Sequence, residues 1–276
     1  MHEKTKELID ALPGAIQAVF ENDDVFKDFL KTMSRFHKYS ANNCLLIWSQ
    51  RPDATRVASF STWKNLGRIV RKSERGIRIL CPHSFRVTNE TTGEEESKIG
   101  WHTGYCWDIS QTYGEELPDI CAPLDADVVG YENLLDVLIR ISPVPVEFVD
   151  HIDSGARGYF SPSEKKIVIC EGSEAEVISV LLHEQAHSWL VAHDTEEKLT
   201  RHHRECEAEA VSYICCTQLG IPCEEASFQY IASWSSDKSV SELRECLTAI
   251  QQTADHILDL IESELNVRLA KEESVA

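Results

Sequence analysis

Several features that would place a chain in a membrane or outside the cell are missing from these 276 residues. No apolar run approaches twenty residues and no charged-then-apolar leader stands at the N-terminus, so neither a membrane span nor export is expected. The ten cysteines include no CxxC pair, which favours reduced, mostly buried thiols. We therefore expect a globular cytoplasmic protein with no membrane partner, in which 42% hydrophobic residues fill the cores of two domains.

The chain also has few basic residues overall. There are 27 Lys or Arg against 46 Asp or Glu, for a net charge of −19, which argues at first against a nucleic-acid partner. However, residues 31–86 carry twelve basic and two acidic residues, a charge of +10, and the remainder carries −29. Such asymmetry is typical of a basic nucleic-acid-binding part joined to an acidic part with another role. Two alternatives stay open: a solvated basic face on a helical domain, and an acidic protein that imitates DNA.

The N-terminal part has the pattern of an α+β unit, a helical module with a small antiparallel sheet. Apolar residues at three- and four-residue spacing predict helices over residues 3–20, 23–37, 40–49 and 61–66. Strand-like stretches at residues 76–87 and 100–109, with turn residues at 91–93, predict the sheet. The polar, acidic stretch 111–127 is interpreted as a linker. We therefore expect domains of residues 1–118 and 119–276.

The C-terminal part predicts helices around a short hairpin. We expect hairpin strands at 156–160 and 166–170, with the second strand as an edge that can bind an extended substrate. An S-x-x-E capping box at Ser173 and Glu176 marks the start of the next helix. The other predicted elements are a helix at 131–141, a strand at 146–149, a helix from 202 that stops at Gly220, and a last helix that begins at a second capping box, Ser239 and Glu242.

The helix that begins at Ser173 carries LLHEQAHSWL, whose centre is an HExxH motif. His183 and His187 are a little over one helical turn apart, so both project from one face and can bind one Zn²⁺. Glu184 is rotated about 100° from His183, which suits a general base that takes a proton from a zinc-activated water. The alternative is that the two histidines make ordinary hydrogen bonds in the helix and bind no metal. The capped helix after a hairpin favours the zinc site.

The third zinc ligand has two candidate sources. His193 has the spacing of HExxHxxGxxH, but Leu190 replaces the glycine that turns the chain back in that motif. In the following helix, Glu205 and Glu209 are four residues apart and share a face, although that face can also be merely solvated. We predict that Glu205 binds zinc and that Glu209 accepts the free N–H of a ligating histidine. The weaker candidates are His202 and His203.

The chain resembles a known family in four stretches of its C-terminal part: GARGYFSPSEKKIVICEG, LLHEQAHSWL, RECEAEAVSYICCTQLGI and YIASW. In this order they are similar to the metallopeptidase domain of ArdC-type antirestriction proteins of mobile elements, which are related to the ImmA/IrrE peptidases. The resemblance implies a zincin-like gluzincin domain. In this family the first Glu of an E-x-x-A-[E/N/D] pattern binds the metal; here the pattern starts at Glu205 and ends at Glu209.

The N-terminal part resembles the single-stranded-DNA-binding domain of the same family, in YSANNCLLIWSQRPDATRVASFSTWKNLGRIVRKSERGIRILCP and GYCWDISQTYGEELP. One departure is Ser73, where the family usually has a glycine, and it affects the geometry of that turn. Single-stranded DNA is bound by basic grooves with aromatic faces. Trp48 and Phe60 are interpreted either as core or as such faces. We assign DNA binding to the aromatic residues Tyr39 and Trp63 and to the basic residues Arg56, Arg68, Arg71, Lys72 and Arg75.

The leading hypothesis is a DNA-associated zinc metalloendopeptidase of antirestriction type. It binds single-stranded DNA with its N-terminal domain and hydrolyses peptide bonds in a protein substrate that the sequence does not identify. The alternative is a non-proteolytic, DNA-binding antirestriction protein whose zinc site is structural or regulatory.

Overall fold

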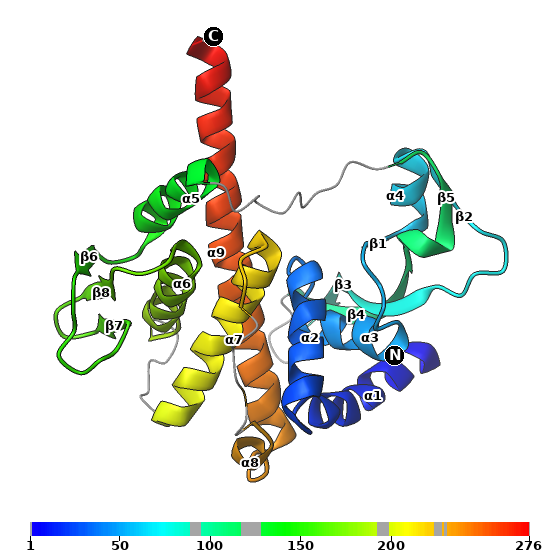
Figure 1. Cartoon of the computed structure of the whole chain (residues 1–276). Coiled ribbons are helices and arrows are strands. Elements are labelled where there is room, and N and C mark those ends of the chain that lie inside the picture. Colours follow the sequence, from blue (N-terminus) through cyan, green and yellow to red (C-terminus); the bar gives the residue numbers. More distant parts are fainter. Residues whose placement is uncertain are drawn as a thin grey trace. The chain divides into compact units, whose positions relative to one another are not determined.

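Figure 1 shows the computed structural model of the chain, which describes residues 2–88, 95–116, 128–191, 199–223, 228 and 231–275. The chain forms two compact units. One consists of Met1–Val19 and Tyr39–Pro118, and the other of Phe20–Lys38 and Asp119–Ala276. The turn expected at residues 91–93 and the last part of the expected linker, from residue 117, lie outside the described residues.

Helix α2 (Asp23–Arg35) belongs to the second unit, so the predicted domain of residues 1–118 is not one continuous unit. Four of its apolar side chains, Phe26, Phe29, Leu30 and Met33, are fully buried, and α2 packs on α7 (Arg201–Leu219) of the same unit. Sequence spacing identifies an amphipathic helix and its apolar face, but it does not identify the distant element that covers that face.

The first unit combines helices with a long β-hairpin. Strands β3 (Ile77–Thr88) and β4 (Glu95–Asp108) pair antiparallel along their length, and the short β1 (Val57–Ala58) pairs with the other edge of β4. The hairpin therefore forms the predicted small antiparallel sheet. The helices of this unit are α1 (Glu3–Val19), α3 (Ala41–Gln50) and α4 (Phe60–Asn65).

A second small sheet pairs β2 (Arg68–Val70) with β5 (Thr112–Gly114), and a 3-10 helix, η1 (Ile109–Gln111), leads into β5. These elements correct the prediction that a linker begins at residue 111. The two strands approach closely because residue 114 is glycine: a Cβ at Gly114 would collide with the carbonyl oxygen of Gly67. Strands of three residues are too short to give a readable alternation of apolar and polar positions, which is why the sequence pattern missed them.

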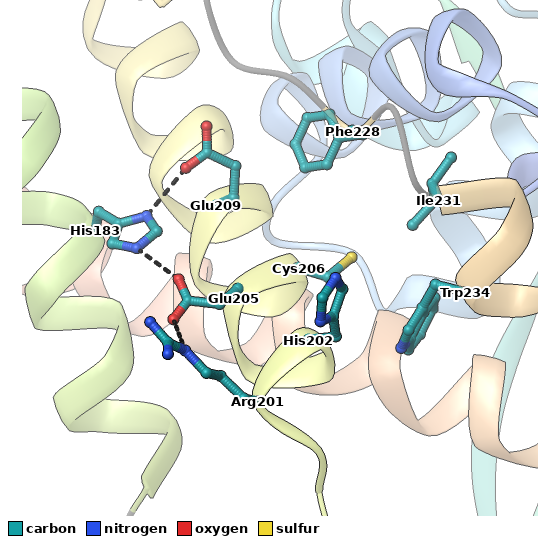
Figure 2. Close-up of a pocket in the computed structure, with 9 residues that line it drawn as sticks. All are labelled: His183, Arg201, His202, Glu205, Cys206, Glu209, Phe228, Ile231 and Trp234. Atoms are coloured by element: carbon teal, nitrogen blue, oxygen red, sulfur yellow. Dashed lines mark hydrogen bonds and ion pairs between the residues drawn. The ribbon is translucent and has the colours of Figure 1, made fainter.

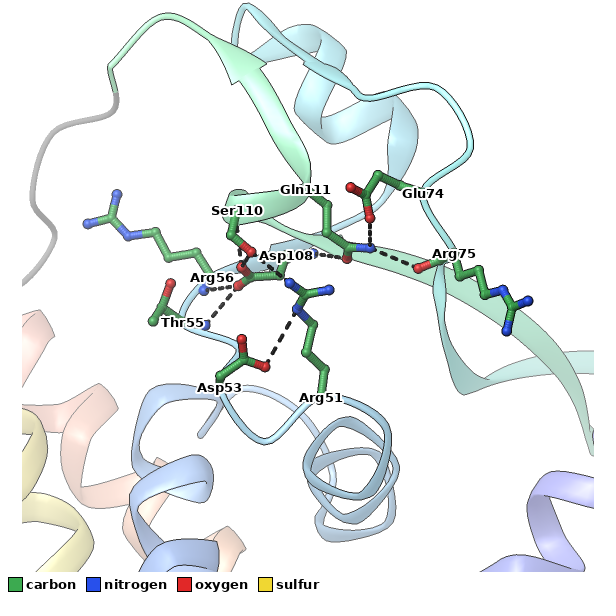
Figure 3. A network of polar contacts seen from close by, with 9 residues as sticks. All are labelled: Arg51, Asp53, Thr55, Arg56, Glu74, Arg75, Asp108, Ser110 and Gln111. Carbon is green, nitrogen blue, oxygen red and sulfur yellow. Dashed lines mark hydrogen bonds and ion pairs between the residues drawn. The ribbon is translucent and has the colours of Figure 1, made fainter.

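A buried carboxylate, Asp108, holds the end of β4 in place (Figure 3). Its Oδ1 accepts the backbone N–H groups of Thr55 (2.7 Å) and Arg56 (3.0 Å), and its Oδ2 accepts the N–H (2.9 Å) and the hydroxyl (2.5 Å) of Ser110. Gln111 completes a capping box by accepting the N–H of Asp108 at 2.9 Å. Burial acts to raise the pKa of Asp108, but these hydrogen bonds outweigh it, so its pKa is lowered.

The sheet of the second unit has the strand order β6-β8-β7. β8 (Lys166–Cys170) pairs in parallel with β6 (Val146–Val149) and antiparallel with β7 (Gly158–Ser161). It is therefore the central strand, and the prediction of an edge strand at 166–170 is wrong. Residues 167–170 are all buried, which is the pattern of a strand covered on both faces. The hairpin edge of this sheet is β7.

Helices of the second unit begin and end at recognisable signals. α9 (Val240–Val275) starts at the predicted capping box, since Glu242 accepts the N–H of Ser239 at 2.8 Å and its own N–H reaches Ser239 Oγ at 3.3 Å. α7 ends at Gly220, whose φ of 70° is left-handed. No helix in the described ranges is long and apolar enough to cross a membrane. The remaining helices are α5 (Val128–Ile141), α6 (Glu174–Val191) and α8 (Ile231–Ser235).

Candidate functional site

Three side chains of ligand type meet between α6 and α7, two helices that pack against each other. His183 and His187 lie one turn apart on α6, and Glu205 lies near the start of α7. The Nε2 atoms of the two histidines are 3.1 Å apart. Glu205 Oε2 lies 3.5 Å from each of them. The tertiary structure thus brings together residues that the sequence places on separate helices.

The spacing of these three atoms suits a zinc ion. A triangle with sides of 3.1, 3.5 and 3.5 Å has a point about 2 Å from every corner, and about 2 Å is the usual Zn–N and Zn–O distance. Two imidazoles and one carboxylate are also a ligand set of catalytic zinc sites, which keep a fourth position open. The Glu205 side chain is 49% exposed, so the cluster is accessible from solvent. The residues present therefore fit the metal.

Glu209 orients one of these histidines. Its Oε2 lies 3.0 Å from Nδ1 of His183, so the carboxylate accepts the ring N–H while Nε2 faces Glu205 (Figure 2). Carboxylates in this position fix the tautomer and the ring orientation of a metal-binding histidine. The rings of His183 and His187 meet edge to face, with centroids 4.8 Å apart. Both rings are therefore held by contacts other than a metal.

The charges of the cluster are unequally distributed. Burial opposes protonation of His183, but hydrogen bonds with Glu205 and Glu209 outweigh it and raise its pKa to about 10. Burial and the charge on His183 lower the pKa of His187 to about 4. The hydrogen bond with His183 lowers the pKa of Glu205 to about 2. A metal cation must therefore displace a proton from His183, whereas His187 and Glu205 are already in their ligand forms.

Glu184 is buried beside the cluster, at 8% exposure. Burial raises its pKa, and the backbone of Phe160 in β7 makes a hydrogen bond with its carboxylate. β7 can approach α6 because residue 158 is glycine: a Cβ at Gly158 would lie 2.6 Å from Cγ1 of Val180, one turn before Glu184. The hairpin edge strand therefore runs next to the candidate base.

A cavity of about 510 Å³ adjoins the cluster (Figure 2). Its polar side is formed by His183, Glu205 and Glu209, and Arg201 Nε lies 3.8 Å from Glu205 Oε1. The opposite side is apolar, so the cavity offers one charged wall and one hydrophobic wall. The remaining lining residues are His202, Cys206, Phe228, Ile231 and Trp234.

The other histidines considered as third ligands lie elsewhere. His202 lines the cavity, but its ring is not part of the three-atom cluster. His203 is buried and pairs with Glu207 at 3.0 Å, so Glu207 is not part of a solvated acidic face. His193 lies outside the described residues.

The first unit places the two aromatic residues assigned to DNA in different surroundings. Trp63 is 2% exposed, and its Nε1 donates to the carbonyl of Trp107 at 2.8 Å. It is a core residue, and its assignment as an exposed aromatic face is wrong, because the short helix α4 turns Trp63 inward and Phe60 outward. Tyr39 is half-buried, with its hydroxyl 3.5 Å from the carbonyl of Val57. Burial raises the pKa of Tyr39 to about 12.

Two of the assigned arginines have structural partners. Arg68 donates from Nε to the hydroxyl of Thr112 at 2.8 Å and from Nη1 to the carbonyl of Glu115. Arg71 donates to the carbonyl of Ser110. These contacts join β2 to the segment around β5, so part of the positive charge of this region supports the fold.

The remaining assigned cations are directed outward. Lys72 and Arg75 are exposed. The side chains of Arg56 and Arg75 point away from the network around Asp108 (Figure 3). Lys72 and Arg75 therefore keep their charge at the surface of the first unit, whereas Arg56 is half-buried.

Three aromatic side chains of β4, Trp101, Tyr105 and Trp107, share one face of the strand, and the sequence pattern did not assign them to DNA binding. Trp101 and Tyr105 are 46% and 40% exposed, and the ring of Tyr105 stacks on that of Trp107 with centroids 6.5 Å apart. Trp107 in turn meets Phe60 edge to face at 6.0 Å. The sequence signal was present in WHTGYCW, because side chains two and four residues apart in a strand share a face. We call Phe60, Trp101, Tyr105 and Trp107 the aromatic row.

Comparison with known proteins agrees with this architecture. Residues 5–103 match the family described as the N-terminal domain of anti-restriction factor ArdC. An uncharacterized protein of Bacillus anthracis is 26% identical over 309 aligned positions, which cover 96% of this chain and 52% of the relative. The chain thus spans about half the length of that relative.

Two crystal structures of the antirestriction ArdC protein from plasmid R388 share the fold. The metal-free structure has a TM-score of 0.56 at 20% identity, over 82% of this chain and 86% of that one. The Mn(II)-bound structure has a TM-score of 0.52 at 18% identity, over 82% and 84%. The molecule is therefore an α+β protein of the ArdC fold with a His-His-Glu cluster. Residues 5–103 are similar to the N-terminal domain of anti-restriction factor ArdC, and over 82% of its length the chain shares the fold of an ArdC protein.

Proposed function

We propose that the chain is a DNA-associated antirestriction protein whose second unit is a zinc metallopeptidase and whose first unit binds single-stranded DNA. The observation that carries the proposal is the meeting of His183, His187 and Glu205 at zinc-binding distances, with Glu184 buried beside them. The names of the ArdC proteins support the antirestriction role. We place the protein in the cytoplasm, where its described cysteines stay free thiols.

In this proposal each residue of the cluster has a chemical role. His183, His187 and Glu205 would hold the zinc ion, which when bound polarises a peptide carbonyl and makes a water more acidic. Glu184 takes a proton from the attacking water and returns it to the departing amine. Burial raises the pKa of Glu184 above its ordinary value, which makes its carboxylate a stronger base than a carboxylate in water. The hydrogen bond with Phe160 keeps the carboxylate in position.

The surroundings of Glu184 also suit an extended peptide. β7 pairs with β8 on one side, and within the described residues its other edge has no strand partner. A substrate strand that pairs with this edge passes Phe160, which contacts Glu184. The apolar wall of the adjoining cavity then accepts a hydrophobic side chain of that peptide. We therefore propose a protein substrate that is unfolded or extended at the cleavage position.

The aromatic row supports the DNA-binding half of the proposal. Bases of a single strand stack on exposed aromatic rings in a sequence-tolerant way, and nearby cations neutralise the phosphates. Trp101 and Tyr105 offer such rings, and Lys72 and Arg75 offer exposed cations in the same unit. The positive charge of residues 31–86 acts in the same direction.

The peptidase half is tested with Glu184→Gln. This change removes the base but leaves the three ligand atoms, so the variant should bind zinc as the wild type does and cleave none of a proteome-derived peptide library. Zinc content is measured by mass spectrometry of the intact protein, and new peptide termini by sequencing. Glu171→Gln, at an exposed position, is the matched control and should cleave normally. Cleavage by Glu184→Gln at the wild-type rate would exclude this mechanism.

The DNA-binding half is tested with Trp101→Ala and a fluorescent oligothymidine. Stacking contributes about 1–3 kcal/mol per base, so binding should weaken by about 5- to 150-fold. Phe148→Ala, which removes an exposed aromatic ring from the second unit, should bind as the wild type does. Equal affinity of Trp101→Ala and wild type would rule out the aromatic row as the DNA surface.

A second candidate function is a non-proteolytic antirestriction protein that shields DNA. The match of residues 5–103 to the N-terminal domain of anti-restriction factor ArdC supports an antirestriction role for the part of the chain that does not contain the His183 cluster. Protection of DNA from a restriction nuclease separates the two functions. If Glu184→Gln protects as well as the wild type and Trp101→Ala does not, shielding is the function and the zinc site is structural or regulatory.

A further inference from the structure

A second cluster of ligand-type side chains lies elsewhere on α7. His203 and Glu207 are four residues apart on this helix, and Cys246 approaches them from α9. Glu205 and Glu207 differ by about 200° around the helix axis, so this cluster and the His183 cluster lie on different sides of α7. The two clusters share no residue.

The members of the second cluster are close together and shielded from water. His203 Nε2 lies 3.0 Å from Glu207 Oε1, and one ligand atom from each of the three residues lies within 4.8 Å of the other two. His203, Glu207 and Cys246 are 8%, 3% and 1% exposed. The ring of His203 is also held edge to face against Trp234, with centroids 4.9 Å apart. Its orientation is therefore fixed before any ligand binds.

The buried carboxylate of Glu207 requires a partner for its negative charge. A carboxylate as deeply buried as that of Glu207 is costly unless it is paired. Its partners are an imidazole and, through a hydrogen bond, the thiol of Cys246. A thiol is a weak hydrogen-bond donor. A divalent cation in place of the thiol proton would neutralise both the carboxylate and the resulting thiolate.

We propose that His203, Glu207 and Cys246 form a second metal site, separate from the His183 cluster, for a borderline-soft divalent ion such as Zn²⁺. The set of one imidazole nitrogen, one carboxylate oxygen and one thiolate sulfur is typical of zinc ligands. On binding, the S–H bond of Cys246 breaks, its proton leaves to solvent, and a metal–sulfur bond forms. No electron is transferred in this step.

The place of this site in the fold indicates a structural role. The ion would tie α7 to α9, and α7 carries Glu205 and Glu209 of the first cluster. A cavity of about 280 Å³ reaches the cluster and is also lined by Thr200, Glu242 and Glu245. It leaves room for a water or a further oxygen at a fourth position. Thiolate ligands are typical of structural zinc sites, and an ion bound here would stabilise the packing of α7 on α9.

Cobalt(II) distinguishes the two sites because only one contains sulfur. The His183 cluster has nitrogen and oxygen ligands alone, so a thiolate-to-cobalt charge-transfer band reports on the second site. The full-length chain, stripped with a chelator and titrated with Co²⁺, should bind a second equivalent and show this band. Cys246→Ser should lose the band and one equivalent. His183→Ala should lose one equivalent and keep the band.

Two controls make the test decisive. Cys206→Ser removes the neighbouring thiol on α7 and should keep the band. If the Cys246 variant does not fold, cadmium NMR of the wild-type chain replaces it, because sulfur coordination shifts that resonance far from the all-nitrogen-and-oxygen position. Binding of one equivalent without a sulfur signature, or a band that survives in Cys246→Ser, would overturn the proposal and leave a hydrogen-bonded triad.

Discussion

Glu209 Oε2 lies 3.0 Å from Nδ1 of His183, on the side of the ring opposite Glu205. Removing such a carboxylate contact commonly lowers metal affinity about 10- to 100-fold. The zinc affinity of Glu209→Gln should therefore be about 10- to 100-fold lower than that of the wild type, as measured by competition with a chromophoric chelator. Glu132→Gln, at an exposed position on α5, should bind as the wild type does. Unchanged affinity of Glu209→Gln would show that His183 needs no such support.

Gly158 sets the distance between β7 and α6. In Gly158→Ala the new Cβ would lie 2.6 Å from Cγ1 of Val180, so the strand must move and Phe160 must move away from Glu184. We expect unfolding free energy to fall by about 1–3 kcal/mol, with peptide cleavage reduced more than zinc affinity.

Val180→Ala supplies the control for this prediction, because it removes the atom that Gly158→Ala would strike. The double variant should regain stability and cleavage relative to Gly158→Ala alone, as seen in chemical denaturation and peptide assays. Purely additive losses in the double variant would mean that Val180 is not the obstacle.

Ser73 has a φ of 71°, in the left-handed region. A residue with a Cβ pays roughly 1–2 kcal/mol there, and glycine does not. Ser73→Gly relieves this strain, but it also gives the unfolded chain more conformational freedom, which opposes folding. The net effect should be an increase of about 1 kcal/mol in the unfolding free energy of the first unit. Ser73→Ala, which keeps the Cβ, should give no gain. Urea denaturation of the three proteins decides between these outcomes.

Asp108 makes the stability of the first unit depend on acid pH. Its pKa is lowered in the folded chain by hydrogen bonds from Ser110, Thr55 and Arg56. Its contribution is therefore complete above the ordinary value of 3.8 and is lost as the pH falls through the lower folded value. Asp108→Asn should cost about 2 kcal/mol near neutral pH.

The pH dependence provides the check on this assignment. The difference in unfolding free energy between wild type and Asp108→Asn should be constant above pH 3.8 and shrink below it. The control must lie outside the hydrogen bonds of Asp108, which include the one from its N–H to Gln111 Oε1. Asp53→Asn, an exposed carboxylate nearby, should leave the pH profile unchanged.

The relation of sequence to structure differs between the two halves of the metal cluster. His183 and His187 lie on one helix, so their spacing alone determines that they share a face. Glu205 is on another helix. It was predicted as the third ligand because Leu190 stands where the HExxHxxGxxH motif has a glycine, and because Glu205 and Glu209 share a helix face. The distance of 3.5 Å from Glu205 Oε2 to each histidine is a property of how α6 packs on α7. Zinc binding and catalysis by these residues remain predictions.

Elsewhere the local pattern was insufficient. The apolar run at 166–170 indicated a strand, but whether a strand is central or at an edge depends on its neighbours, and β8 has one on each side. Trp63 and Phe60 are three residues apart, and only packing decided that Trp63 is buried and Phe60 exposed. The fully buried face of α2 was visible in the sequence, but its contact with α7 was not.

The sequence by itself determined the start of α9 at Ser239 and Glu242 and the end of α7 at Gly220, because a capping box and a glycine stop act over a few residues. It also determined the HExxH pair. The tertiary structure decided which faces meet: Glu205 at the histidines, Phe160 at Glu184, and Cys246 at His203 and Glu207. These contacts join residues far apart in the chain, and they depend on packing between whole elements rather than on spacing within one.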